Sequence, residues 1–357
     1  MKIGESRQQL TNSPGVLERL TMIRIGILGA TGYTALELIK LLLRHPDARI
    51  TALTSRQQGE PHVASVHPAL TGRLDLRLRD LNPEQVAAEC DCVFSCLPHG
   101  ASAQAVKPLV DAGVRVVDFS ADYRLNDLAV YRQWYEETHC DAERLGRIPY
   151  GLPELFADQI APAPLVANPG CYPTSAILAM WPLLKNGLVE AGGIIFDSKS
   201  GVSGAGRTPK LTTHFPECNE SFSAYNVGRH RHNPEIDQVL GMAAGQPIET
   251  IFTPHLVPMN RGILTTAYGL PTQAVTEPQL MDALRTTYAD QTFVQVVDHL
   301  PATKDVSGTN FCQLTARLVR GRVIVISCID NLVKGASGAA VQNFNWMYGF
   351  PETTALL

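Results

Sequence analysis

The sequence feature that most constrains the fold of this chain is a glycine-rich turn near its start. Gly26, Gly29 and Gly32 give the spacing G-x-x-G-x-x-G between an apolar run at residues 23–28 and apolar residues at helical spacing over 36–43. Glycines at such a junction allow a tight turn and let a ligand approach the backbone, and the amide-rich start of the helix attracts a phosphate. The turn predicts a dinucleotide-binding strand–turn–helix; a turn that needs its glycines only for packing is the alternative.

Strand and helix patterns alternate through the first half of the chain, with strands at 50–54, 93–97 and 114–119 and a helix at 101–112. This alternation is typical of a doubly wound parallel sheet, which binds ligands at the carboxyl ends of its strands. After about residue 170, strands follow one another with few helices between them, at 194–198, 250–254, 262–270, 293–297, 312–319 and 322–329. The predicted fold class is α/β: a Rossmann-type doubly wound parallel sheet plus an α+β domain with a mixed, largely antiparallel sheet.

The end of the second strand indicates which dinucleotide is bound. NAD-binding versions of this fold usually place Asp or Glu there to bind the ribose hydroxyls. Here the strand ends in Leu53-Thr54-Ser55-Arg56-Gln57, with no acid, and Arg56 can meet a 2′-phosphate with help from Ser55. The sequence therefore predicts NADP; a solvated surface arginine is the alternative.

Cys171 is the candidate nucleophile. It follows Asn168-Pro169-Gly170 and precedes a helical pattern over 175–184, so it lies where a helix begins. The helix dipole at that end stabilises a thiolate, which is the reactive form of cysteine. A buried packing cysteine is the alternative.

A histidine pair forms the densest polar cluster of the chain, in Gly228-Arg-His230-Arg-His232-Asn-Pro-Glu235. In an extended segment His230 and His232 point to the same side, so either can act as the acid/base, and Glu235 can orient one of them. An H-x-H pair can also bind a metal, but no third ligand is evident, and we predict no metal. A surface cluster of histidine and arginine is the other reading.

Three arginines in polar loops, Arg124, Arg207 and Arg261, are candidates to bind the carboxylate or phosphate of a substrate. Each has a plain alternative as a structural salt-bridge partner. The glycine- and serine-rich loop that ends in Arg207 can also hold an anion through its backbone amides.

Composition excludes several classes of protein. The chain has 357 residues, 45% hydrophobic and 18% charged, with a formal net charge of -4 and no basic stripe for nucleic acid. No apolar run approaches the roughly 18 residues of a membrane span. The eight cysteines lack zinc spacing, so we expect mostly buried, reduced thiols and a cytoplasmic protein.

The motifs occur together and in order from about residue 22 to the end of the chain: Gly29-Ala-Thr-Gly-Tyr33, Leu97-Pro-His-Gly100, Ser120-Ala-Asp-Tyr-Arg124, Pro149-Tyr-Gly-Leu-Pro-Glu154, Asn168-Pro-Gly-Cys-Tyr-Pro-Thr174, Ser200-Gly-Val-Ser-Gly-Ala-Gly-Arg207, His230-Arg-His232 and Asp330-Asn-Leu-Val-Lys-Gly335. In this the chain resembles the N-acetyl-gamma-glutamyl-phosphate reductases of arginine biosynthesis, which are similar in fold and chemistry to aspartate-semialdehyde dehydrogenase.

The resemblance implies a dimeric or tetrameric NADP-dependent enzyme in which Cys171 attacks an acyl phosphate and the resulting thioester is reduced to N-acetyl-glutamate 5-semialdehyde. His230 or His232 serves as the acid/base. The expected cofactor contacts are Gly29, Thr31, Gly32, Tyr33, Ser55, Arg56, Pro98, Ser203, Gly204 and Asn331. Reduction of aspartyl phosphate or of carrier-bound 2-aminoadipyl phosphate is the nearest alternative. A non-catalytic NADP-binding regulator is a different class of alternative.

With this length favouring two domains, we expect a flexible N-terminal extension over 1–21 and an NADP-binding Rossmann domain over 22–170, which the C-terminal segment 335–357 joins. Residues 171–334 are expected to form the catalytic and oligomerisation domain.

Overall fold

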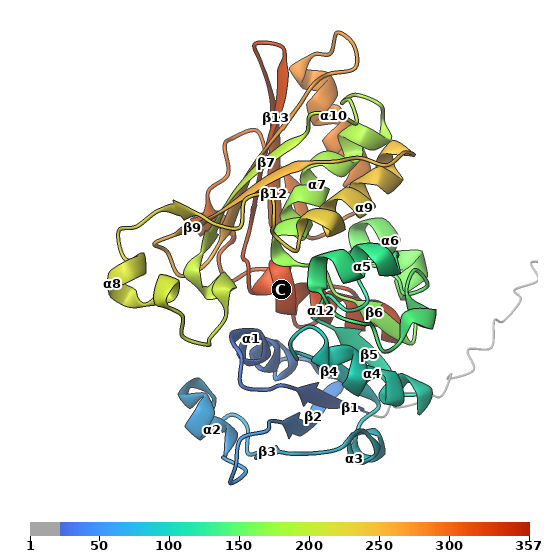
Figure 1. The fold of residues 1–357 in the computed structure, drawn as a ribbon, viewed down its shortest axis with the longest axis vertical. Coiled ribbons are helices and arrows are strands. Elements are labelled where there is room, and N and C mark those ends of the chain that lie inside the picture. Colours follow the sequence, from blue (N-terminus) through green and yellow to red (C-terminus); the bar gives the residue numbers. More distant parts are fainter. Residues whose placement is uncertain (1–21) are drawn as a thin grey trace, which may run out of the picture.

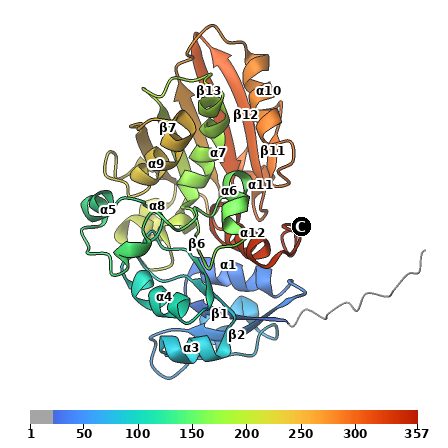
Figure 2. The same ribbon diagram turned by 90° about the vertical axis from the view of Figure 1, so that its right-hand side faces the viewer.

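The structure is a computed structural model that describes residues 22–357, so the predicted extension over 1–21 lies outside it. The chain builds two sheets, one near each end of the molecule, and its C-terminal helix lies between them (Figure 1). Figure 2 shows the same two layers after a quarter turn, with the first sheet again below the second.

The first sheet has six strands, all parallel: β1 (Ile23–Leu28), β2 (Ala48–Thr54), β3 (Leu78–Arg79), β4 (Cys92–Ser95), β5 (Arg115–Asp118) and β6 (Leu165–Ala167). Their spatial order is β3-β2-β1-β4-β5-β6. This order reverses between β1 and β4, and in such sheets the crevice for a dinucleotide lies at that switch point. The predicted Rossmann-type parallel sheet is confirmed.

The helices of this part are α1 (Tyr33–Leu42), α2 (Val63–Val66), α3 (Pro83–Glu89), α4 (Ala101–Asp111), α5 (Leu128–Tyr135) and α6 (Pro153–Ile160). The glycine-rich turn leads from β1 into α1. Gly29 has φ +71°, and a Cβ on it would lie 3.0 Å from the carbonyl oxygen of Cys96, so both conformation and space require glycine.

The second sheet has seven strands: β7 (Ile195–Gly201), β8 (Ser223–Ala224), β9 (Ile251–Val257), β10 (Ile263–Gly269), β11 (Val294–Val296), β12 (Cys312–Val319) and β13 (Arg322–Ile329). Their order is β11-β12-β13-β10-β7-β9-β8. Pairs β11–β12 and β7–β9 are parallel and the other pairs antiparallel, which confirms a mixed, largely antiparallel sheet.

Three helices pack on one face of this sheet: α7 (Cys171–Lys185), α9 (Asn233–Ala244) and α10 (Glu277–Thr287) (Figures 1 and 2). The short helices α8 (Phe215–Cys218) and α11 (Thr303–Val306) lie in loops. Helix α10 was not predicted from the sequence, although Thr276 and Gln279 form a capping box at its start.

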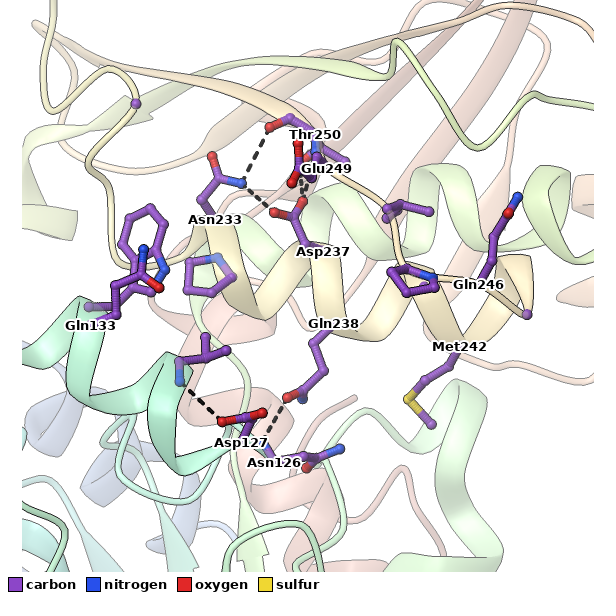
Figure 3. A pocket seen from close by; sticks show the side chains of 18 residues that line it. Asn126, Asp127, Gln133, Asn233, Asp237, Gln238, Met242, Gln246, Glu249 and Thr250 are labelled. Atoms are coloured by element: carbon purple, nitrogen blue, oxygen red, sulfur yellow. Dashed lines mark hydrogen bonds between the residues drawn. The ribbon is translucent and has the colours of Figure 1, made fainter.

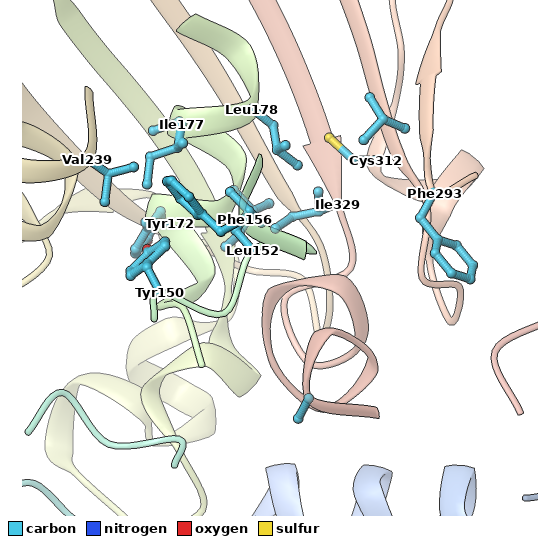
Figure 4. Packing of buried hydrophobic residues seen from close by; sticks show 14 of the residues in the cluster. Tyr150, Leu152, Phe156, Tyr172, Ile177, Leu178, Val239, Phe293, Cys312 and Ile329 are labelled. Carbon is cyan, nitrogen blue, oxygen red and sulfur yellow. The ribbon is translucent and has the colours of Figure 1, made fainter. Parts of the chain in front are cut away.

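Helix α7 is the centre of the hydrophobic core. Ile177 and Leu178 are fully buried and lie among Phe156, Val239 and Ile329 from the surrounding helices and strand (Figure 4). A helix that is apolar on nearly every side is held from all directions. The first turn of α7 is therefore a rigid place for a reactive side chain.

The end of the chain returns to the first sheet. After the π-helical turn η5 (Val333–Ser337), helix α12 (Gly338–Tyr348) hydrogen-bonds to that part of the molecule: His45 Nε2 lies 3.0 Å from Asn345 Oδ1, and the Tyr348 hydroxyl donates to the Asp91 carbonyl at 3.0 Å. Over residues 22–357, none of the helices combines the length and the apolar character of a membrane span.

Candidate active site

Cys171 is the first residue of α7, and Gly170 is the N-cap. The side chain is partly buried. Burial raises the pKa of the Cys171 thiol to about 11, while the backbone amide of Tyr172 and the charge of Arg124 act in the opposite direction. The helix start thus acts on the thiol in the predicted direction, towards the thiolate, but in the free protein the effect of burial is larger.

Glu235 lies at the centre of the hydrogen bonds around Cys171. Its buried carboxylate accepts from the backbone N–H of Gly170 at 2.8 Å, from the Tyr150 hydroxyl at 2.6 Å and from Arg124 at 3.1 Å. We expected Glu235 to orient a histidine. Among residues 22–357 its bonds instead fix the loop that carries the nucleophile, so this part of the prediction was wrong.

The two histidines lie together, as predicted, with ring centroids 4.8 Å apart. Nδ1 of His230 accepts the backbone N–H of His232 at 3.2 Å. His232 faces the nucleophile loop, because a Cβ on Gly170 would lie 2.6 Å from its Nε2. Its Nδ1 is buried and has no hydrogen-bond partner within the described part of the chain.

Both histidines are held neutral. Burial lowers the pKa of His230 to about 4, and Arg231 adds to this effect. Burial lowers the pKa of His232 well below its ordinary value, with help from His230 and Arg124. A neutral imidazole beside a thiol can accept the thiol proton, which is the arrangement that activates a cysteine.

The glycine loop can hold the pyrophosphate of a dinucleotide. Gly32 is the N-cap of α1, has no side-chain cap, and a Cβ on it would meet nothing within 4 Å. The amide of Gly29 bonds to Thr54 Oγ1 at 3.3 Å and that of Ala30 to Thr54 O at 2.9 Å, whereas those of Thr31 and Gly32 have no partner among the described residues. Free amides at an open helix start fit an anion.

Other predicted cofactor contacts surround this loop. Ser55 and exposed Arg56 follow β2 at its carboxyl end, and Arg56 makes no hydrogen bond or ion pair within residues 22–357. Tyr33, at the first position of α1, is 37% exposed, and Pro98 is exposed after β4. These side chains are free to meet a ligand at the switch point of the sheet.

Ser203, Gly204 and Asn331, which were also predicted to contact the cofactor, are held together by hydrogen bonds and close packing. Asn331 donates to Ser203 Oγ at 3.0 Å and accepts from the Gly262 amide at 2.8 Å. A Cβ on Gly204 would lie 2.9 Å from Ser200 Oγ. The amide of Asn331 is thus committed to holding the loop of Ser203.

Each of the three arginines has protein partners. The guanidinium of Arg124 donates to Asn168 O at 2.8 Å and Phe119 O at 2.7 Å besides Glu235, so it braces the nucleophile loop. Arg124 is therefore in part a structural salt-bridge partner, which was the alternative to substrate binding. Its terminal nitrogens keep one N–H each for a ligand.

Arg207 and Arg261 bridge the two parts of the chain. Arg261 pairs with Glu37 of α1 at 2.5 Å and with buried Asp330 at 3.3 Å. Arg207 donates to the Thr31 carbonyl of the glycine loop at 3.0 Å. The contacts of Arg261 therefore fit a structural salt-bridge partner better than a substrate-binding residue. Arg207 lies next to the glycine loop, where the cofactor is expected.

Gly335 packs directly under the nucleophile. A Cβ on Gly335 would lie 2.8 Å from the Cβ of Cys171 and 3.2 Å from its Cα. The neighbouring Lys334 is fully buried, pairs with Glu154 and donates to Gln342 at 2.9 Å. This π-helical turn is one of the irregularities that recur at functional sites.

A surface hollow of about 970 Å³ lies between α9 and α5 (Figure 3). Its polar wall includes Asp237, which accepts from Thr250 at 2.6 Å. The lining contains neither Cys171 nor either histidine. The hollow is therefore not the cavity in which the candidate nucleophile and histidines lie.

Two of the site residues were not predicted from the sequence. Tyr150 was quoted within a motif but given no role, and only its contact with Glu235 reveals one. His67, which binds the glycine loop through the Ala30 carbonyl at 2.8 Å, had no sequence signal. As for metals, residues 22–357 contain no group of three or more potential ligands, counting His, Cys, Asp and Glu.

Comparison with known proteins agrees with this geometry. The family model for the semialdehyde dehydrogenase NAD-binding domain matches residues 24–163, and that for the semialdehyde dehydrogenase dimerisation domain matches residues 171–331. Aspartate semialdehyde dehydrogenase with NADP from Candida albicans superposes with a TM-score of 0.70 at 17% identity, covering 92% of this chain and 99% of that one. The fold and site thus define a two-domain oxidoreductase of the semialdehyde dehydrogenase type.

Closer relatives give the family. The N-acetyl-gamma-glutamyl-phosphate reductase of Rhodopirellula baltica is 54% identical over 94% of this chain and 98% of its own length. That of Symbiobacterium thermophilum is 51% identical over 94% and 97%. The chain belongs to the N-acetyl-gamma-glutamyl-phosphate reductase family.

Proposed function

We propose that the chain reduces N-acetyl-L-glutamyl 5-phosphate to N-acetyl-L-glutamate 5-semialdehyde and phosphate with NADPH, in the cytoplasm, as a step of L-arginine biosynthesis. The observation that carries the proposal is the bond from the Gly170 amide to Glu235. It holds Cys171 at the start of a buried helix, directly after Gly170, against which neutral His232 packs. Relatives aligned over nearly their whole length bear the name of this activity.

The residues that would hold the cofactor are the open glycine loop, with Thr31, Gly32 and Tyr33, and the end of β2, with Ser55 and Arg56. Pro98 lies at the neighbouring strand end, and Asn331 supports the loop of Ser203 and Gly204. When bound, NADPH supplies a hydride to the thioester carbon.

The side chains account for the other steps. As Sγ of Cys171 bonds to the acyl carbon, His232 takes the thiol proton and passes it to the phosphate, whose bond to that carbon breaks. Arg124 directs its remaining N–H groups at the substrate anion. After reduction the C–S bond breaks, its electron pair returns to sulfur, and the aldehyde leaves while a solvent proton restores the thiol. The route is efficient because a thioester on a rigid helix is held in position for attack.

The test is NADPH oxidation with N-acetyl-glutamyl phosphate, together with the phosphate-dependent reverse reaction. Cys171→Ser should abolish both reactions and leave NADPH binding intact, while Cys140→Ser, at an exposed cysteine, should change neither. Aspartyl phosphate and carrier-bound 2-aminoadipyl phosphate serve as comparison substrates, and faster turnover of either would overturn the assignment.

A second comparison assigns the acid/base. His232→Asn should lose roughly 10²–10⁴-fold in rate, the usual contribution of a general acid or base. His230→Asn should lose much less, because its Nδ1 accepts from the backbone and its ring packs against Tyr172 and Phe252. The reverse order of effects would assign the role to His230.

For the domains, we propose that residues 22–170 with segment 335–357 bind NADP and that residues 171–334 carry catalysis and assembly. The face of the second sheet opposite α7, α9 and α10, here called the outer face, supports assembly as a homodimer or homotetramer. On it, partly exposed Tyr268 and Ile324 pair across β10 and β13, next to Thr266 and Ile326. A second copy of the chain would cover this apolar patch.

A further inference from the structure

Arg207 makes all its hydrogen bonds to the other domain. It follows the loop of Ser203 in the second half of the chain, and its guanidinium donates to the carbonyls of Thr31 at 3.0 Å and Val66 at 2.9 Å and to His67 Nδ1 at 3.2 Å. His67 is buried, and its Nε2 lies 2.8 Å from the Ala30 carbonyl. Because a carbonyl only accepts, Nε2 carries the proton and Nδ1 accepts from Arg207.

These contacts hold two successive peptide groups of the glycine loop by their carbonyls. In a trans peptide the C=O and the N–H point in opposite directions. Fixing the carbonyls of Ala30 and Thr31 therefore aims the N–H groups of Thr31 and Gly32 the other way. Those two amides have no partner among the described residues, and the space beside Gly32 is open.

We propose that Arg207, acting through His67 and Thr31, is a positioning residue that orients the phosphate-binding amides of the glycine loop. The proposal rests on NADP binding as proposed above. Arg207 reaches this loop only when the two domains adopt the arrangement described here. Binding of the dinucleotide pyrophosphate and closure of the domains are therefore linked, and by thermodynamic reciprocity each favours the other.

The test is the Kd of NADPH and of NADH for the full-length protein, measured by calorimetry without substrate. Arg207→Met should weaken both cofactors by the same factor, about tenfold, within the roughly 5–150-fold range of typical coupling between sites. Lys210→Met, on the same loop and of the same charge, should leave both values unchanged. Arg56→Ala, by contrast, should weaken NADPH alone, because it removes a contact to the 2′-phosphate.

Two further measurements separate positioning from general stability. His67→Gln keeps a donor for Ala30 and an acceptor for Arg207, so it should retain the wild-type Kd for both cofactors. His67→Leu should raise the Kd as much as Arg207→Met does. The double variant of His67→Leu and Arg207→Met should bind little more weakly than either single variant, because both remove the same support. Hydrogen exchange of the free protein should show faster exchange at the Thr31 and Gly32 amides in Arg207→Met.

An unchanged Kd for both cofactors in Arg207→Met would overturn the proposal, and so would weakening of NADPH alone. An unchanged Kd with a raised KM for the acyl phosphate would return Arg207 to substrate binding. Failure of the proposed function is distinguishable, since a protein that does not reduce the acyl phosphate would still show the change in Kd.

Discussion

At the scale of single residues, Cys171 shows two opposing effects on one thiol. The helix start and Arg124 favour the thiolate, but burial raises the pKa to about 11. The free enzyme therefore holds a thiol at neutral pH. In the mechanism proposed above, neutral His232, which packs against Gly170, is the base that removes the thiol proton.

Alkylation of the free enzyme tests this balance. Because the thiolate is the reactive form, labelling of Cys171 by iodoacetamide should rise about tenfold per pH unit up to a pKa of about 11. Exposed Cys140 should label faster at pH near 8. Labelled peptides quantified by mass spectrometry between pH 7 and 10 give both rates, and a plateau for Cys171 below pH 8 would show that the dipole prevails.

The candidate site residues that belong to a short sequence motif could be predicted from the sequence. The nucleophile, the paired histidines and the missing acid after β2 were readable from local patterns. The partners of Glu235 were not, because Tyr150, Gly170 and Arg124 come from three separate segments that only the folded chain brings together. The same holds for Arg207, whose partner His67 lies in another domain.

At the scale of elements, the π-helical turn after β13 packs against the start of α7, which carries the nucleophile. Lys334 and Glu154 pair in the buried interior, with Gln342 bonded to both, and so hold the π-helical turn in place. Gly335 in this turn touches the first residue of α7. Two elements far apart in sequence thus determine where the sulfur lies.

Gly335→Ala should move Cys171. The new Cβ would lie 2.8 Å from the Cys171 Cβ, too close for any side-chain contact, so the start of α7 must shift. A displacement near 1 Å can cost about 10²-fold in rate. We expect a loss of kcat of that order with an unchanged Kd for NADPH. Gly192→Ala, where a Cβ meets nothing within 4 Å, is the control, and equal rates in both variants would contradict this role.

The limits of several strands could be predicted from the pattern of apolar residues in the sequence. Strands β1, β12 and β13 have the predicted limits, because their apolar pattern ends where the turn begins. Helix α10 was missed because its buried face rests on few residues, chiefly Leu280 and Leu284, within a largely polar segment. The order of the strands in the second sheet was beyond prediction, since sequence patterns do not state which strands pair.

At the scale of the whole molecule, the outer face predicts assembly. Ile324→Glu would place a charge on this face, where a second copy would bury it without a partner, so the variant should dissociate to monomers. Met242→Glu changes an apolar residue that is 49% exposed on α9, away from the sheet, and should leave the assembly intact. Sedimentation velocity of wild type and both variants gives the answer; an unchanged mass for Ile324→Glu would exclude this face as the interface.

Stability against pH depends on histidines that are buried in the neutral form. His230 titrates near 6.5 when unfolded, but burial lowers its pKa to about 4 in the folded protein. Between these values the unfolded chain binds more protons, so the contribution of His230 to stability is present above pH 6.5 and is lost as pH falls through 4. Burial raises the pKa of Asp118 to about 6, which acts in the opposite sense.

The test compares the pH dependence of the urea midpoint in wild type and in His230→Gln. Both proteins contain Asp118, so its contribution cancels in the difference. Urea midpoints measured at steps from pH 7.5 to 5 should fall more steeply for the wild type, because glutamine takes up no proton in either state. The two curves should run parallel above about pH 7, where His230 is neutral whether folded or unfolded. Parallel curves over the whole range would mean that His230 titrates alike in both states, and that its burial does not oppose the charge.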